Sequence, residues 1–169
     1  MELYLIRHAE AGRPDAGRWP GDRARPLTAE GVVRFEQAAA GLARLAPRVD
    51  LVLASPVARA WQTAEILRQT AGWPEPEPCG QLEPGNEPHA ALESIEARIG
   101  AARLAVVGHE PTLSALAALL LAGEDVDLGL TFQPGGVACL RIDGDPEPAS
   151  AQLVWWLTAD VLRQLGSAQ

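Results

Sequence analysis

The sequence of 169 residues has no lysine, only two cysteines and no long uncharged apolar run. All fourteen of its Lys and Arg positions are therefore arginine, and 22 Asp and Glu residues give a net charge of −8. Such an acidic chain is not expected to bind nucleic acid or an anionic membrane. Its most apolar helical stretch, residues 113–122, is far shorter than the roughly 20 residues of a membrane span.

The small number of cysteines also bears on the cellular compartment in which the protein is expected. Cys79 and Cys139 lack the spacing of a CxxC pair, so we expect free thiols in a reducing compartment; a disulfide between them remains open. The chain starts directly on an apolar segment, without the basic and apolar regions of a secretory signal. We therefore expect a cytoplasmic protein, and its length fits one domain spanning residues 1–169.

Strand-like and helix-like patterns alternate along the chain. Short apolar runs at residues 3–6, 51–54 and 103–107 predict buried strands, and the segments that follow them have helical periodicity. Thr28 and Ser55-Pro56 are expected to begin two of these helices, and an acidic helix over 87–99 should turn Ile99 inward. Residues 137–142 and 152–157 predict antiparallel strands before a last helix. The expected fold is an α/β three-layer sandwich with a mostly parallel doubly wound sheet, flanking helices and a C-terminal antiparallel hairpin.

Charged and imidazole side chains follow these strands where they end. Arg7 and His8 follow the first strand, His109 follows the third, and Arg59 lies one turn into the helix after the second. Because chemistry in open α/β sheets gathers beyond the carboxyl ends of the strands, we expect these four residues to meet there. The remaining histidine, His89, stands in an acidic segment and is expected at the surface.

Two guanidinium groups and two imidazoles suit phosphoryl transfer. Arginines can bind the equatorial oxygens of a phosphoryl group, and an imidazole can attack phosphorus to form a phosphohistidine that water then hydrolyses. The loop over residues 12–25 holds four more arginines, which are Arg13, Arg18, Arg23 and Arg25. This loop is either a solvated linker or a segment that closes over an anionic substrate.

Four motifs occur in order: Arg7-His8-Ala9-Glu10, residues 25–31 (RPLTAEG), residues 55–64 (SPVARAWQTA) and Gly108-His109. With them the chain resembles the histidine phosphatase superfamily, which has the phosphoglycerate-mutase-like (RHG) fold, and most of all its SixA-type phosphohistidine phosphatase branch. The resemblance implies that His8 is the nucleophile and that Arg7, Arg59 and His109 hold the phosphoryl group. It also implies that neither a metal nor an organic cofactor takes part.

The sequence departs from the family pattern at two points. Ala9 stands where the family has glycine, which is tolerable unless that residue needs a positive φ. No clear acid is present to protonate the leaving group, and Glu83 is the best candidate by position. Glu10 is expected to pair with an arginine and not to touch phosphate.

These residues predict a cofactor-independent phosphatase that works through a phosphohistidine intermediate on His8. Its substrate is expected to be phosphohistidine in a protein, with a small-molecule phosphomonoester as the alternative. A phosphate-binding module without catalysis is a further reading. A mutase is less favoured, because the chain is too short for an obvious lid that would keep water from the phosphoenzyme. The sequence does not indicate an oligomeric state.

Overall fold

Six strands form one sheet in the structure, a computed structural model that describes residues 1–124 and 126–167. Their order across the sheet is β3-β2-β4-β1-β5-β6. The bounds are β1 Glu2–Arg7, β2 Leu51–Ala54, β3 Glu77–Pro78, β4 Arg103–Gly108, β5 Val137–Ile142 and β6 Ala151–Leu157. Strands β1 to β4 are parallel, while β5 is antiparallel to β1 and to β6. The expected parallel sheet with an antiparallel hairpin is confirmed.

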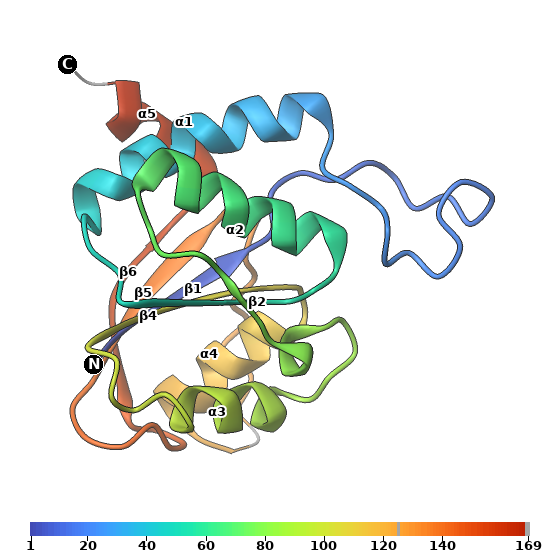
Figure 1. Cartoon of the computed structure of the whole chain (residues 1–169). Helices are drawn as coiled ribbons and strands as arrows, with labels where there is room; N and C mark the ends of the chain where they lie inside the picture. The colour runs from blue at the N-terminus through green and yellow to red at the C-terminus, as the bar shows by residue number, and fades with distance from the viewer. Residues whose placement is uncertain (125, 168–169) are drawn as a thin grey trace.

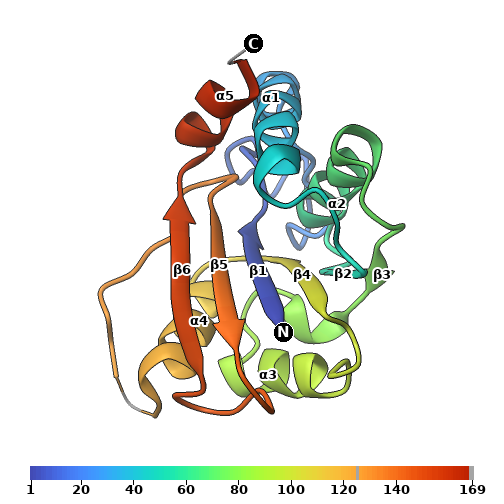
Figure 2. The same cartoon turned by 90° about the vertical axis from the view of Figure 1, so that its left-hand side faces the viewer.

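Helices cover both faces of this sheet (Figures 1 and 2). On one face lie α1 (Ala29–Leu45), α2 (Ala58–Ala71) and α5 (Ala159–Ser167). On the other face lie α3 (Pro88–Glu96) and α4 (Thr112–Ala122), with the short 3-10 helix η1 (Gly80–Leu82). This three-layer arrangement is the one predicted from the alternation of elements.

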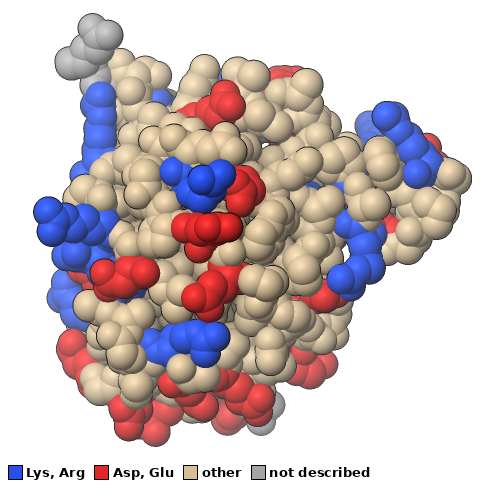
Figure 3. Space-filling view, viewed as in Figure 1, with Lys and Arg blue, Asp and Glu red and all other residues tan. Residues whose placement is uncertain are grey.

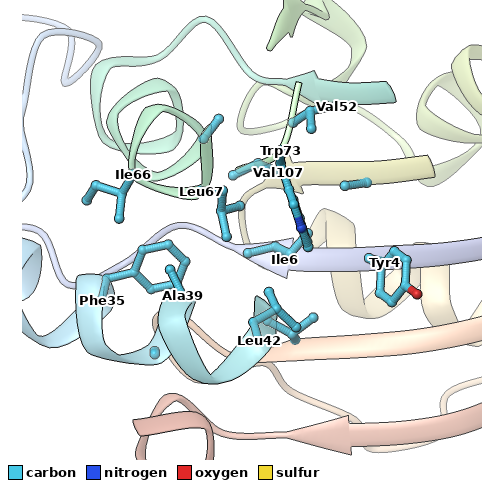
Figure 4. Close-up of a cluster of buried hydrophobic side chains, with 14 of the residues drawn as sticks. Tyr4, Ile6, Phe35, Ala39, Leu42, Val52, Ile66, Leu67, Trp73 and Val107 are labelled. Carbon is cyan, nitrogen blue, oxygen red and sulfur yellow. The ribbon is translucent and has the colours of Figure 1, made fainter. Parts of the chain in front are cut away.

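Strand β1 is buried on both sides. Successive side chains of a strand point to opposite faces, so Tyr4 and Ile6 pack under α1 and α2 while Leu3 and Leu5 pack against α4. All four are at most 3% exposed. Figure 4 shows Tyr4 and Ile6 among the side chains between the sheet and the first helical layer. A strand enclosed in this way needs an uninterrupted apolar run, and the polar residues begin where the enclosure ends.

Helix α1 begins beside the end of β1. The Thr28 hydroxyl oxygen accepts a hydrogen bond from the Gly31 N–H at 2.9 Å, which confirms Thr28 as the N-cap. A Cβ on Gly31 would lie 2.2 Å from the carbonyl oxygen of Glu10. Only glycine therefore allows the helix start to approach the backbone that follows His8.

Two local expectations were wrong. Helix α2 begins at Ala58 after Val57, so Ser55 is not its N-cap, and the buried Ser55 hydroxyl has other partners. Helix α3 ends at Glu96, which leaves Ile99 51% exposed instead of buried.

Cys79 and Cys139 are free and buried in separate clusters on opposite faces of the sheet, which confirms the free thiols. Within residues 1–124 and 126–167, no helix is both long and apolar enough to cross a bilayer.

The segment between β1 and α1 stands away from the rest of the molecule (Figure 1). Its base is closed by an isolated bridge between Ala11 and Leu27 and by the Arg25 guanidinium, which donates to the carbonyl of Gly12. Arg13, Arg18 and Arg23 are exposed along it, and Figure 3 shows the basic side chains on this projection.

Candidate active site

The structure brings together the four residues predicted to meet at the carboxyl edge of the sheet. Arg7 ends β1 opposite Gly108 of β4, and the His8 N–H donates to the Gly108 carbonyl at 3.0 Å. The rings of His8 and His109 have centroids 5.0 Å apart. Arg59 reaches them from the first turn of α2, with its Nε 3.2 Å from Nε2 of His8. The parallel register of β1, β4 and β2 produces this meeting, because it sets the ends of the three strands side by side.

Two hydrogen bonds define the protonation of the His8 ring. Its Nδ1 lies 2.7 Å from the carbonyl oxygen of Ala9, which can only accept, so Nδ1 carries the hydrogen. Its Nε2 faces the Nε–H of Arg59, which can only donate, so Nε2 holds a lone pair. The neutral ring therefore presents a nucleophilic nitrogen to the arginine.

His109 has the corresponding arrangement with Ser55. The Ser55 oxygen accepts from the Val57 N–H at 3.3 Å and lies 3.0 Å from Nε2 of His109. The Ser55 hydroxyl keeps its own hydrogen while its oxygen accepts from the Val57 N–H, so it can donate to Nε2 of His109. The hydrogen of the neutral His109 ring is then on Nδ1.

Two buried polar atoms in the site lack a partner. They are Nε of Arg7 and Nδ1 of His109, and they are the only buried side-chain nitrogen or oxygen atoms without a hydrogen bond in the part of the chain that the structure describes. Both are donors in the states described above. Leaving a buried donor unpaired is unfavourable by about 1–3 kcal/mol, and a bound anion is the kind of partner that satisfies such donors.

Burial controls the charge of both imidazoles. The pKa of His8 is lowered from 6.5 to about 4 by burial first and then by the charges of Arg59, Arg7 and Arg25, while the hydrogen bond to the Ala9 carbonyl opposes the shift. The pKa of His109 is lowered to about 2, again by burial first and then by His8 and the arginines. The neighbouring guanidinium groups act in the same direction, but burial is the larger cause for both histidines.

The loop over residues 12–25 supplies two residues of the site, Arg25, which belongs to the predicted motif over 25–31, and Asp22, which no sequence pattern indicated. Asp22 accepts from Arg25 and lies 3.1 Å from NH1 of Arg59 through both its carbonyl and its carboxylate oxygen. Its hydrogen bond from Arg25 lowers the pKa of this carboxyl group. The RPLT motif that begins at Arg25 was the one available signal, and it gave no role to Asp22 three residues earlier. The base of the loop thus borders the site, while the rest of it projects away from the molecule (Figure 1).

Glu83 is tied to the same loop. Its carboxylate forms a bidentate ion pair with Arg23, whose backbone carbonyl accepts from the Ala58 N–H at the start of α2. The carbonyl of the preceding Leu82 lies 3.6 Å from the point where a Cβ on Gly108 would be. Glu83 therefore stands at the margin of the site, held by Arg23 and not by Arg7, His8, Arg59 or His109.

The remaining expectations concern residues around the site. Glu10 pairs with Arg34 at 3.5 Å, as predicted. Ala9 needs no positive φ and is held by its N–H, which donates to the Thr63 hydroxyl at 3.0 Å. His89 is exposed and pairs with Glu124 on the surface. In residues 1–124 and 126–167, no group of three or more His, Cys, Asp or Glu side chains is placed to hold a metal ion.

The fold and this edge of the sheet define a class, the hydrolases that act on phosphate esters. Comparison with known proteins gives the family. A model of the histidine phosphatase superfamily (branch 1) matches residues 3–83, and the chain belongs to this superfamily. A relative from Mycobacterium tuberculosis, described as an uncharacterized protein, is 36% identical over 160 residues, which cover 88% of this chain and 96% of the relative.

Solved structures agree with this assignment. The protein histidine phosphatase SixA complexed with tungstate has a TM-score of 0.82 at 24% identity, over 96% of this chain and 99% of that one. A putative phosphohistidine phosphatase SixA from Agrobacterium tumefaciens has a TM-score of 0.75 at 26% identity, over 93% and 97% of the two chains. The structural likeness is thus to SixA-type phosphohistidine phosphatases.

Proposed function

We propose that the chain hydrolyses phosphohistidine in a protein through a covalent phosphohistidine formed on its own His8. The observation that carries this proposal is the pair of unpartnered donors, Arg7 Nε and His109 Nδ1, beside a neutral imidazole whose Nε2 holds a lone pair. A phosphoryl group bound here would accept hydrogen bonds from both donors and lie next to the nucleophilic Nε2 of His8.

The first step forms the bond between Nε2 of His8 and phosphorus as the bond to the leaving group breaks. In the free enzyme the Arg59 Nε–H donates a hydrogen bond to the lone pair on His8 Nε2. This hydrogen bond must move to a phosphoryl oxygen before Nε2 can attack phosphorus. As the ring becomes positive, the Ala9 carbonyl stabilises the hydrogen on Nδ1. Water then attacks phosphorus, the P–N bond breaks, orthophosphate leaves and His8 is neutral again.

The leaving group favours phosphohistidine over an alkyl phosphate. An alkoxide needs a proton as it departs, and a positioned general acid contributes typically 10²–10⁴-fold. The candidate acid Glu83 is held as an ion pair by Arg23 in this structure. An imidazole leaving group can depart without such an acid because it can arrive already protonated. The SixA-type relatives support the same substrate class.

Trapping the intermediate tests the proposal. Enzyme mixed with a ³²P-phosphohistidine protein and quenched in alkaline detergent should carry an acid-labile label, and His8→Ala should carry none. His89→Ala is the matched control, since this exposed histidine pairs only with Glu124 in the structure, and it should label like the wild type. Full activity in His8→Ala would overturn the mechanism. Faster hydrolysis of small phosphomonoesters would assign the alternative substrate, and binding without turnover would leave a phosphate-binding module.

A further inference from the structure

A chain of hydrogen bonds leads from Glu110 to Arg7. Glu110 follows His109, and its Oε1 accepts from the Phe132 N–H at 2.7 Å while its other oxygen accepts from the Ser114 hydroxyl. The carbonyl of Phe132 accepts in turn from NH1 of Arg7. The backbone of one residue, Phe132, is thus held at its N–H by Glu110 and holds the Arg7 side chain by its carbonyl.

The same segment binds the backbone on either side of Arg7. Gly135 N–H donates to the carbonyls of Arg7 and His8 at 3.2 and 3.0 Å, and Arg7 N–H donates to the Gly136 carbonyl at 3.1 Å. Phe132 itself is fully buried, and its ring stacks on Trp156 with centroids 3.9 Å apart. Residues 132–136 therefore hold Arg7 by both its side chain and its backbone.

We propose that Glu110 is a positioning residue that aims the Arg7 guanidinium at the phosphoryl group by fixing the backbone of Phe132, whose N–H it binds and whose carbonyl binds Arg7. A guanidinium is planar and its donors have fixed directions. Once NH1 is held by the Phe132 carbonyl, the direction of the unpartnered Nε–H is set as well. This inference rests on the proposed function, because it assigns Arg7 a phosphoryl group to bind.

Glu110 also counteracts the effect of burial on the charge of Arg7. Burial lowers the pKa of the Arg7 guanidinium, and the carboxylate of Glu110 opposes that shift. Charge and geometry can be separated, because glutamine keeps an oxygen that accepts from the Phe132 N–H and an amide that donates to Ser114. If geometry is the main contribution, glutamine will replace Glu110 and alanine will not.

The experiment compares Glu110→Gln and Glu110→Ala with Glu96→Ala, a control that removes an exposed carboxylate from α3. We expect Glu110→Ala to weaken binding of inorganic phosphate, measured by calorimetry, about tenfold and to lower kcat/KM for p-nitrophenyl phosphate roughly ten- to a hundredfold, the size of effect expected when a group near the chemistry is misplaced by about 1 Å. Glu110→Gln should stay within about threefold of the wild type. A Glu110→Ala variant that binds phosphate like the control would overturn the proposal.

A double-mutant cycle distinguishes positioning from a general structural role. If Glu110 acts through Arg7, Glu110→Ala should cause no further loss in an Arg7→Ala background; an equal loss in both backgrounds would contradict the proposal. The Nε–H resonance of Arg7 in NMR spectra supplies a readout without substrate, and Glu110→Ala should make its exchange with water faster. If the wild type hydrolyses no phosphorylated substrate, the proposed function is refuted. The Arg7 Nε–H resonance still tests the role of Glu110, because an unchanged exchange rate in Glu110→Ala would overturn that role.

Discussion

Ser55 and His109 come from different strand ends and are joined by a hydrogen bond of 3.0 Å between Ser55 Oγ and His109 Nε2. Ser55 is fully buried and follows β2, and His109 follows β4 next to it in the sheet. The Ser55 hydroxyl keeps its own hydrogen while its oxygen accepts from the Val57 N–H, so it can donate to Nε2. In that arrangement the hydrogen of the neutral His109 ring is on Nδ1, the buried atom without a partner.

Ser55→Ala should therefore impair the site without unfolding the protein. The variant loses the hydrogen bond from the Val57 N–H and the one with His109, each worth about 0.5–1.5 kcal/mol, and releases the choice of tautomer in His109. We expect kcat/KM to fall about tenfold, and ¹⁵N NMR of the imidazole to show a mixture of the two neutral tautomers of His109. Ser94→Ala on α3 is the control, since that hydroxyl bonds only within its own helix. An unchanged tautomer in Ser55→Ala would contradict this account.

Arg59 should matter more in the transition state than in the ground state. Removing a preorganised donor of this kind lowers the rate about 10²–10³-fold, and we expect that loss in kcat for Arg59→Ala. Arg59→Lys should recover little, because an ammonium cannot hold His8 Nε2 and Asp22 at the same time. Arg68→Ala removes an exposed arginine from the same helix and serves as the control. A kcat within about twofold of the wild type in Arg59→Ala would refute the role.

The two buried histidines should make the protein less stable in mild acid. Their pKa values fall from 6.5 in the unfolded chain to about 4 for His8 and about 2 for His109 in the folded one. Between pH 6.5 and 4 the unfolded state thus binds more protons, and the free energy of unfolding decreases as the pH falls. Each histidine contributes at most about 1.4 kcal/mol per pH unit to this slope.

Urea unfolding at several pH values between 7 and 5 measures the slope. His109→Gln should reduce it by roughly 1 kcal/mol per pH unit whatever its effect on stability at pH 7. His89→Gln is the matched control, and it should not reduce the slope, because Glu124 raises the pKa of His89 in the folded state. Parallel curves for wild type and His109→Gln would show that His109 is not buried in its neutral form.

The role of Glu83 can be measured with a series of leaving groups. If Glu83 leaves its pair with Arg23 during turnover and donates a proton, Glu83→Gln should slow alkyl phosphates far more than aryl phosphates or phosphohistidine. Arg23→Ala, which frees the carboxylate, should then speed alkyl phosphates selectively. Equal losses for all leaving groups would mean that Glu83 shapes the site without acting as an acid. No loss for any would strengthen the case for a phosphohistidine substrate.

Local sequence was sufficient for the parts of the site that lie at strand ends. The apolar runs before Arg7 and His109 require burial on both faces, so the polar residues that follow had to lie at the edge of the sheet. It was less reliable for helix starts. Ser55-Pro56 has the chemistry of an N-cap, but the buried His109 ring offers the serine a partner that the helix end does not.

Residue patterns were enough to predict the order of strands and helices along the chain, the burial of β1 and the four residues that gather at its end, because each depends on near neighbours and on one repeating pattern. Long-range packing was needed to bring Asp22 and Arg25 into the site, to pair Arg23 with Glu83, and to hold Arg7 through Glu110 and Phe132. These contacts connect positions 22 to 125 residues apart in the chain, or pass through irregular loops. No periodicity encodes such contacts; they follow from how the packed sheet places its loops in space.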